Sequence, residues 1–153
     1  MLTKFTALAM GVLVSVSVSA ADMATLTRQA QNGDAAAQSD LADEYYEQGN
    51  HAKAFEWNTK AAGQGYAAAQ NNLGGMYRQG QGVRQDYQKA VEWYTKAAHQ
   101  GFAEAQYNLG AMYYNGQGVS QNKSTAKRYF GQACDNGYQS GCDHYRILNE
   151  QGY

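Results

Sequence analysis

The sequence predicts an all-α protein, an α-α superhelix (solenoid) of about 3.5 helix-turn-helix repeats. Three observations carry this prediction. The chain of 153 residues contains no proline, whereas a β-sandwich of that length normally uses several in its turns. Its apolar residues are skewed toward alanine and tyrosine, small and flat side chains that suit closely packed helices. A set of landmarks recurs with a period of 36 residues, and a fixed period in this range is typical of solenoids.

Length and composition limit the remaining possibilities. The length suits one domain of ordinary size. Hydrophobic residues make up 44% of the chain and charged residues 16%, which favours a folded chain over a disordered one. The formal net charge of −1 argues against a nucleic-acid-binding protein, since such proteins need clustered Lys and Arg to displace counterions.

The N-terminal residues differ from the rest and predict a cleavable signal peptide at residues 1–20. Lys4 supplies a positive start, and Phe5 to Val18 is an uncharged, largely apolar run. This run is shorter than the roughly 20 residues that span a bilayer, which argues against the alternative of an uncleaved membrane anchor. We expect the cut to follow Ala20 and to leave a periplasmic or secreted protein without a membrane segment. No cysteine follows the run, so no residue is available for a lipid anchor.

The repeat is most visible in three glycines, Gly65, Gly101 and Gly137, which are spaced 36 residues apart. After Gly65 the chain reads YAAAQNNLGGMYRQGQG, and after Gly101 it reads FAEAQYNLGAMYYNGQG. An earlier copy starts at Gly33 and is four residues shorter, because the GxGV link between its two helices is missing. We therefore expect a single domain of residues 21–153, with repeats at 33–64, 65–100 and 101–136 and capping half-repeats at 22–32 and 137–150.

Each copy should begin with a helix that follows the repeat glycine. In the middle copy Ala69, Leu73, Met76 and Tyr77 fall on one face of this helix. Gly80 follows the last periodic residue, where a left-handed turn that ends a helix favours glycine. The third copy repeats the pattern with Ala105, Leu109, Met112, Tyr113 and Gly116.

The second helix of each copy should start at Asp86 or Asn122, both of which are good N-caps. It carries an inward face and ends at the next repeat glycine. Its inward residues in the middle copy are Ala90, Trp93, Tyr94 and Ala97. We expect the recurring small residues, including Gly74 and Gly110, to let neighbouring backbones come close. One helix pair cannot bury its apolar face alone, so stability should come from contact with the next repeat.

These motifs resemble the Sel-one-like repeat (SLR) family, a 36-residue relative of the tetratricopeptide helical repeats. The shared pattern is A-x-A-Q-x-x-L-G-x-M-Y-x-x-G-x-G-V, followed by K-A-x-x-W-Y-x-K-A-A-x-Q-G. The resemblance covers Gly33 to roughly Asn149. It weakens in the first copy, where Ala42 replaces a glycine, and in the last helix, where Tyr145 and Arg146 replace Leu-Gly. Departures at both ends are typical of capping elements.

The two cysteines predict a structural disulfide. Cys134 takes the repeat position of Ala98, near the end of a second helix, and Cys142 takes that of Gln106, early in the following helix. These positions face each other across a tight glycine turn, close enough for a bridge. An exported protein meets an oxidising compartment, and cysteine-rich secreted members of the resembling family have similar bridges. A redox pair is the alternative, but its usual C-x-x-C spacing is missing.

No catalytic, metal or cofactor site is predicted. Ser120 to Lys123 matches the S-x-x-K motif of penicillin-binding enzymes, but Ser120 is expected in a link between helices and the partner motifs are missing. His51, His99 and His144 lie in different repeats without metal-ligand spacing. His144 could meet a carboxylate such as Asp143, but nothing nearby completes a catalytic set. The GxG links follow a helix, so they are interpreted as turns rather than phosphate-binding loops.

The positions that vary between copies predict a binding face. Six, seven, ten, thirteen and fourteen residues after each repeat glycine, the first helix should expose side chains that packing does not need, among them Ser39 and Asn71. If the first helices line the concave side, these residues line a groove. Exposed Tyr and Arg often dominate binding energy at interfaces, although tyrosines here could instead pack between layers. The candidate partner-binding residues are Tyr46, Asn72, Arg78, Tyr107, Asn108 and Tyr114.

The predicted function is that of an exported scaffold or adaptor that binds a partner protein or peptide on its concave face, without enzymatic activity. One alternative is a peptidoglycan-related role in the cell wall, either binding the polymer or modulating an enzyme that acts on it. Another is a secreted effector, since a cleavable signal serves both destinations. A penicillin-binding or β-lactamase-like enzyme is the enzymatic alternative. This expectation depends on the fold and on missing catalytic groups, so it does not name the partner.

Overall fold

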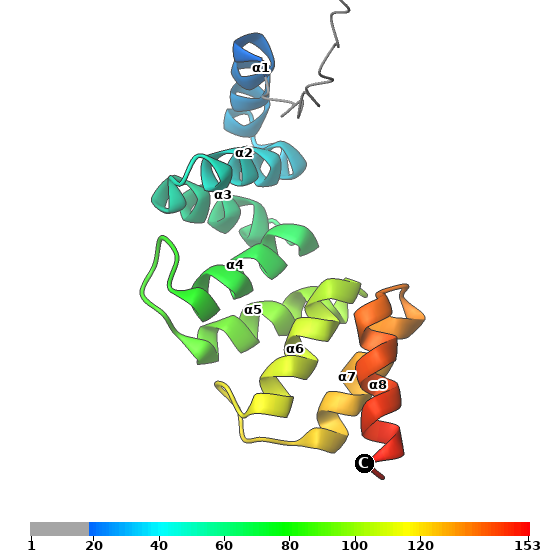
Figure 1. Ribbon diagram of the computed structural model, residues 1–153. Helices are drawn as coiled ribbons and strands as arrows, with labels where there is room; N and C mark the ends of the chain where they lie inside the picture. The colour runs from blue at the N-terminus through cyan, green and yellow to red at the C-terminus, as the bar shows by residue number, and fades with distance from the viewer. Residues whose placement is uncertain (1–18) are drawn as a thin grey trace, which may run out of the picture.

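The computed structural model describes residues 19–153, which form eight α-helices and no β-strand (Figure 1). The predicted signal peptide falls largely on residues 1–18, outside the described part of the chain, and residue 20 already begins the first helix. The helices are α1 (Ala20–Gln31), α2 (Ala35–Glu47), α3 (His51–Gly63), α4 (Ala67–Gln79), α5 (Tyr87–His99), α6 (Ala103–Asn115), α7 (Lys123–Asp135) and α8 (Gln139–Glu150).

The helices stack in chain order, each packed chiefly against the helix before it and the helix after it. In Figure 1 the stack runs from α1 in blue to α8 in red, with α2–α3, α4–α5 and α6–α7 as three successive pairs. The single helices α1 and α8 close the two ends. This arrangement is the all-α solenoid of about 3.5 repeats that the 36-residue period predicts.

The helix boundaries follow the local chemistry expected from the sequence. The carboxylate of Asp86 accepts a hydrogen bond from the backbone N–H of Lys89 at 3.0 Å, and the amide oxygen of Asn122 accepts one from Thr125 at 2.9 Å. Both predicted N-caps of second helices are therefore confirmed. Gly80 ends α4 with φ of +70°, a left-handed conformation that side chains disfavour, as its position after the periodic residues predicts.

The core is built from small residues and a few large rings. Ala69, Leu73 and Met76 of α4 are buried, as are Ala90 and Ala97 of α5. The two largest fully buried side chains among the described residues are Tyr94 of α5 and Phe130 of α7.

The glycines within the first helices have a different role from the one predicted. A Cβ added to Gly74 would lie 2.5 Å from the ring of Tyr94, and one added to Gly110 would lie 2.9 Å from the ring of Phe130. Gly74 therefore makes room for an aromatic ring rather than for a neighbouring backbone. Gly110 faces a ring first, with the carbonyl of Ala126 next, 3.3 Å from such a Cβ.

A repeated glutamine links each first helix to the second helix before it. Gln70 is only 5% exposed, and its Nε2 donates a hydrogen bond to the carbonyl of Ala62 at 3.3 Å. Its Oε1 accepts from Nε2 of Gln100, at 2.8 Å, at the end of the second helix of the same repeat. Both polar ends of a buried side chain are thus satisfied, as burial requires. The equivalent glutamines are Gln38, which donates to Ala30, and Gln106, which donates to Ala98.

Candidate functional site

The first helices α2, α4 and α6 enclose a cleft with a volume of about 290 Å³. Four of the six candidate binding residues line it: Tyr46 from α2, Asn72 and Arg78 from α4, and Asn108 from α6. We call this hollow the polar cleft, because its lining also includes Asp43 and Glu104. The cleft lies where the variable positions of the repeat predict a groove.

Hydrogen bonds between repeats fix the side chains of the polar cleft. Nδ2 of Asn72 donates to a carboxylate oxygen of Asp43 at 3.0 Å, which connects α4 to α2. Nδ2 of Asn108 donates to Oδ1 of Asn71 at 3.0 Å, which connects α6 to α4. The Tyr46 hydroxyl donates to Oε1 of Gln81 at 2.7 Å. Most of the cleft wall is therefore held in place before any ligand arrives.

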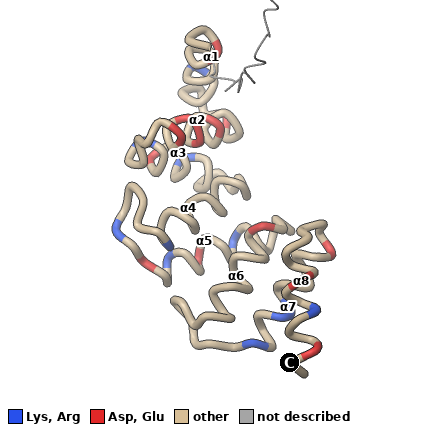
Figure 2. Tube along the Cα trace, viewed as in Figure 1, with Lys and Arg blue, Asp and Glu red and all other residues tan. Residues whose placement is uncertain are grey.

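The charge around the polar cleft is mainly negative on the α2 side. Asp40, Asp43, Glu44 and Glu47 all lie on α2, which has no basic residue (Figure 2). Partial burial, followed by the charges of Asp40, Glu47 and Glu44, raises the pKa of Asp43 to about 6. Arg78 is the one cationic residue among the residues that line this cleft.

The floor of the polar cleft holds Tyr94, a residue that the sequence assigned only to the core. Its side chain is 1% exposed, yet the residue lines the cleft from α5 below Gly75. A sequence signal for it exists in the repeat. The same repeat position carries Asn58 in the first copy and Phe130 in the third. Only the middle copy has a ring with a hydroxyl group there, Tyr94.

The other two candidate residues, Tyr107 and Tyr114, line a second hollow of about 350 Å³ between α6 and α8. We call it the apolar pocket, because Phe130, Ile147 and Leu148 also line it. Tyr114 is 36% exposed. The ring of Tyr107 instead packs between layers, with its centroid 5.3 Å from that of Phe130. The predicted face is thus divided into a polar and an apolar hollow.

Two residues expected on the exposed face are buried, which corrects that part of the prediction. Ser39 is 2% exposed and Asn71 is 5% exposed. Both occupy the position six residues after the repeat glycine, as does Tyr107. Asn71 pairs with Asn108 of the next first helix, and Tyr107 packs against Tyr138 and Phe130, which follow it in the stack. This repeat position packs toward the following layer rather than toward solvent.

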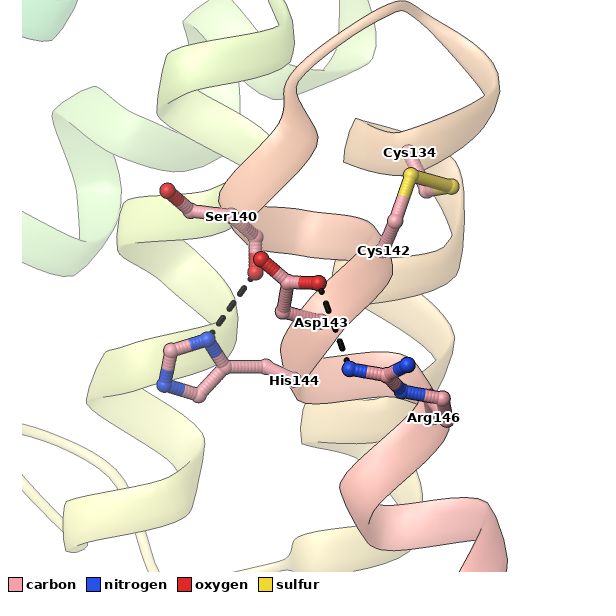
Figure 3. The surroundings of a disulfide bond; sticks show 6 residues. All are labelled: Cys134, Ser140, Cys142, Asp143, His144 and Arg146. Atoms are coloured by element: carbon pink, nitrogen blue, oxygen red, sulfur yellow. Dashed lines mark hydrogen bonds and ion pairs between the residues drawn. A yellow bond between two sulfur atoms is a disulfide. The ribbon is translucent and has the colours of Figure 1, made fainter.

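The predicted disulfide between Cys134 and Cys142 is present and joins α7 to α8, with the two Cα atoms 4.6 Å apart (Figure 3). His144 and Asp143, which the sequence allowed to meet, do not contact each other. Asp143 instead pairs with Arg146 at 3.6 Å, and Nδ1 of His144 lies 2.9 Å from the carbonyl oxygen of Ser140.

The residues considered as possible catalytic or metal-binding groups do not come together in a site. Ser120 lies in the link before α7, exposed to solvent, and Lys123 is the first residue of that helix. The S-x-x-K motif needs both groups on one helical turn, so its geometry is not met. His51 and His99 lie at the start of α3 and the end of α5. Residues 19–153 hold no group of three or more His, Cys, Asp or Glu side chains that could bind a metal ion.

Among helices α1 to α8, none has the length and apolar character of a membrane-spanning segment.

In α-solenoid repeat proteins, stacked helix pairs each contact only their neighbours along the chain. The helices of this chain are arranged in that way, so it belongs to this class. Within that class the chain belongs to the Sel1 repeat family, whose model matches residues 35–66, 67–102 and 103–138. The repeats of this family generally serve as protein-interaction scaffolds, and its members are typically not enzymes.

Solved structures of this family are similar to the chain over most of its length. A protective antigen present in uropathogenic Escherichia coli strains, which displays an SLR fold, is 39% identical with a TM-score of 0.81. That alignment covers 85% of this chain and 29% of the antigen, so this chain spans under a third of its length. A Sel1 repeat protein from Oxalobacter formigenes is 34% identical with a TM-score of 0.74, covering 82% of this chain and 98% of that protein.

The cysteine-rich protein B of Helicobacter pylori is 26% identical, with a TM-score of 0.64, over 79% of this chain and 95% of that protein. No curated protein matches the sequence.

Proposed function

We propose that this chain is an exported adaptor that holds an extended segment of a partner protein across the polar cleft and the apolar pocket. The observation that carries the proposal is the adjacency of these two hollows on α6, where Asn108 lines the first and Tyr107 the second. An extended peptide that crosses α6 could place polar groups on one side and an apolar side chain on the other. Tyr46, Arg78 and Tyr114 are the anchors we assign to it.

Three observations support export. The Cys134–Cys142 disulfide suits an oxidising compartment, since disulfides are rare in the cytosol. The apolar run after Lys4 has the pattern of a secretory signal. A protective antigen among the similar structures also fits a protein that leaves the cytoplasm. Intact-mass measurement of the purified chain tests this: a first residue of Ala21 supports export, and a chain that retains Met1 to Ala20 contradicts it.

Photo-crosslinking tests partner binding. A photoreactive amino acid replaces Tyr114 in the full-length chain, which is expressed in the cell that produces it, and trapped species are identified by mass spectrometry. The matched control places the same group at Glu92, an exposed residue of α5 that lines neither hollow. We expect one dominant protein adduct at position 114 that is lost when Tyr46 and Arg78 are changed to alanine. Equal adducts at positions 114 and 92 would reject the binding face, and an adduct with cell-wall glycan would favour the peptidoglycan-related role.

A further inference from the structure

Three asparagines of the chain are followed directly by glycine: Asn32, Asn115 and Asn136. An Asn-Gly step is prone to spontaneous deamidation, because glycine has no Cβ to hinder attack by its own main-chain nitrogen on the asparagine side chain. All three asparagines are exposed to water. The three steps therefore differ in their hydrogen bonds and in how readily the surrounding turn opens, rather than in local sequence or access to water.

The side chain of Asn136 is held by its own repeat. Its Nδ2 donates a hydrogen bond to Oε1 of Gln106 at 2.8 Å. Asn136 also lies inside the loop that the disulfide between Cys134 and Cys142 closes. A bonded side chain in a cross-linked loop is protected from attack by the following nitrogen.

Asn32 occupies the same repeat position at the end of α1 but lacks the equivalent partner. No first helix precedes α1 within residues 19–153, so no glutamine like Gln106 accepts from it, and its side chain forms no hydrogen bond with the described residues. The two main-chain hydrogen bonds that close its turn measure 3.1 and 3.2 Å, against 2.9 and 2.8 Å for the equivalent bonds after Asn136. The turn after Asn32 is thus the more weakly closed of the two.

Attack also requires the turn to open, because the N–H of each following glycine is bonded to a carbonyl of its own turn. Asn115 is the last residue of α6, which packs between α5 and α7. In contrast, α1 lies at one end of the stack and packs chiefly against α2 (Figure 1). Local opening costs least at such ends, so the turn after Asn32 should open most often.

We propose that Asn32–Gly33 is a site of spontaneous deamidation and that its conversion loosens α1 from the stack. Water is the only co-reactant. The main-chain nitrogen of Gly33 loses its proton and attacks Cγ of Asn32; the bond from Cγ to Nδ2 breaks, the amide group leaves as ammonia with that proton, and a cyclic succinimide remains. Water then opens the ring at either carbonyl, which gives aspartate or isoaspartate at position 32.

Both products weaken the end of α1. Each places a negative charge at the C-terminal end of a helix, where the backbone dipole disfavours it. Isoaspartate also routes the main chain through the former side chain and lengthens it, so the two N–H groups that close the turn no longer reach their carbonyl partners. The helix that covers this end of the stack then loses its connection to α2.

The test compares the three Asn-Gly steps in the folded and the unfolded protein. The purified protein is incubated at pH 8 with and without denaturant and digested at acid pH, and conversion of each asparagine is measured by mass spectrometry. In denaturant we expect similar rates at the three sites, since glycine follows each. In the folded protein Asn32 should convert faster than Asn115, and roughly tenfold faster than Asn136, the effect of one hydrogen bond.

The matched control is Asn32→Gln, because Gln64 and Gln100 occupy this repeat position and glutamine forms its cyclic imide far more slowly. It should abolish conversion at position 32. The converted parent protein, separated by its extra negative charge on an ion-exchange column, should exchange its α1 amide hydrogens faster than the unconverted protein. Removing the disulfide with Cys134→Ala and Cys142→Ala should raise conversion at Asn136.

Equal rates at Asn32 and Asn136 in the folded protein, or faster conversion at Asn115, would overturn the assignment of the site. Unchanged hydrogen exchange of α1 in the converted protein would overturn the loosening. Neither outcome depends on a binding partner, so the proposal stands or fails separately from the adaptor function.

Discussion

Cys142 is bonded to Cys134 at the repeat position where Gln106, one repeat earlier, donates its Nε2 to the carbonyl of Ala98 at 3.2 Å. The disulfide therefore replaces a hydrogen bond that links successive helix pairs elsewhere in the stack. The replacement has a physical reason. Oε1 of Gln106 accepts from Asn136, at the end of the second helix of its own repeat, at 2.8 Å. In the described chain α8 is followed by no second helix, so a glutamine at position 142 would lack this donor.

Removal of the disulfide should destabilise the C-terminal helix. We expect Cys134→Ala with Cys142→Ala to lower the free energy of unfolding by roughly 2–3 kcal/mol, from the entropy of the closed loop. The matched variant Cys134→Ala with Cys142→Gln restores the repeat's own hydrogen bond and should recover about 1 kcal/mol. Urea unfolding of the three proteins measures both effects. Equal stability of the two double variants would contradict the positional equivalence of Cys142 and Gln106.

Two adjacent glycines of α4 should respond to alanine in opposite directions. Gly74→Ala places a methyl group 2.5 Å from the ring of Tyr94, and such overpacking costs about 1–3 kcal/mol. Gly75→Ala meets only the Tyr94 hydroxyl at 3.7 Å, and should stabilise the helix by up to about 1 kcal/mol. Thermal melts of the two variants check the contrast. A stable Gly74→Ala protein would show that the ring has room to move.

The raised pKa of Asp43 predicts a specific dependence of stability on pH. The folded chain holds this proton more tightly than the unfolded chain, in which the pKa is near 3.8. Its stabilising contribution is therefore complete below that value and is lost as the pH rises through about 6. Asp43→Asn stays neutral and should be more stable than the parent at pH 8, by about 1 kcal/mol after allowance for solvent screening.

At pH 4 the advantage of Asp43→Asn should have largely disappeared. Asp40→Asn, one helical turn away on α2, is the matched control and removes a neighbouring charge instead. Urea unfolding at both pH values makes the comparison. An equal gain for Asp43→Asn at pH 4 and pH 8 would show that its ionisation is not the cause.

The buried glutamine of the middle repeat should be more important for stability than its polar character suggests. Gln70→Met keeps the side-chain length but removes two hydrogen bonds, one to the carbonyl of Ala62 and one from the Gln100 amide; each of these groups keeps one bond to the backbone of Gly65. We expect a loss of about 1–2 kcal/mol, the net contribution of two hydrogen bonds. Gln79→Met, at the exposed end of the same helix, should stay within about 0.5 kcal/mol of the parent. Equal denaturant midpoints for Gln70→Met and Gln79→Met would contradict the role of Gln70.

Alanine substitutions at Tyr107 and Tyr114 should distinguish a tyrosine that packs in the fold from one that binds a partner. Tyr107→Ala removes a half-buried ring that packs against Phe130 and Tyr138, and should cost about 2 kcal/mol of stability, less than a fully buried ring. Tyr114→Ala removes a ring that is 36% exposed and should change stability far less. The expected reverse order in partner capture tests the assignment of Tyr114 as an anchor. Melting temperatures that change equally in the two variants would contradict the difference in packing.

Much of the fold could be predicted because glycines and caps act locally. Gly80 and Asp86 end and begin helices through their own backbone and side-chain preferences, and the 36-residue period then fixes the order of the stack. The Cys134–Cys142 bridge could be predicted for the same reason, since the repeat places both residues at one glycine turn.

The candidate site was harder to predict because it depends on contacts between repeats. Variation between copies located Arg78 and Asn108 in the polar cleft, but it also placed the buried Ser39 and Asn71 on the exposed face. Position six packs toward the next layer, and a single helix pattern does not contain that information. Tyr94 was missed because its ring belongs to the core while its hydroxyl group belongs to the cleft.

The Cys134–Cys142 disulfide makes the two ends of the helix stack unequal in stability. In a linear array each unit is stabilised only by its neighbours, so loss of structure spreads from whichever end opens first. Here α8 is fastened to α7 by a bond, whereas α1 meets α2 through side-chain packing and hydrogen bonds alone. Under oxidising conditions we therefore expect the stack to melt from the α1 side, with amide hydrogens in α1 and α2 exchanging before those near the bridge. Reduction should remove this difference and allow the stack to open from either end.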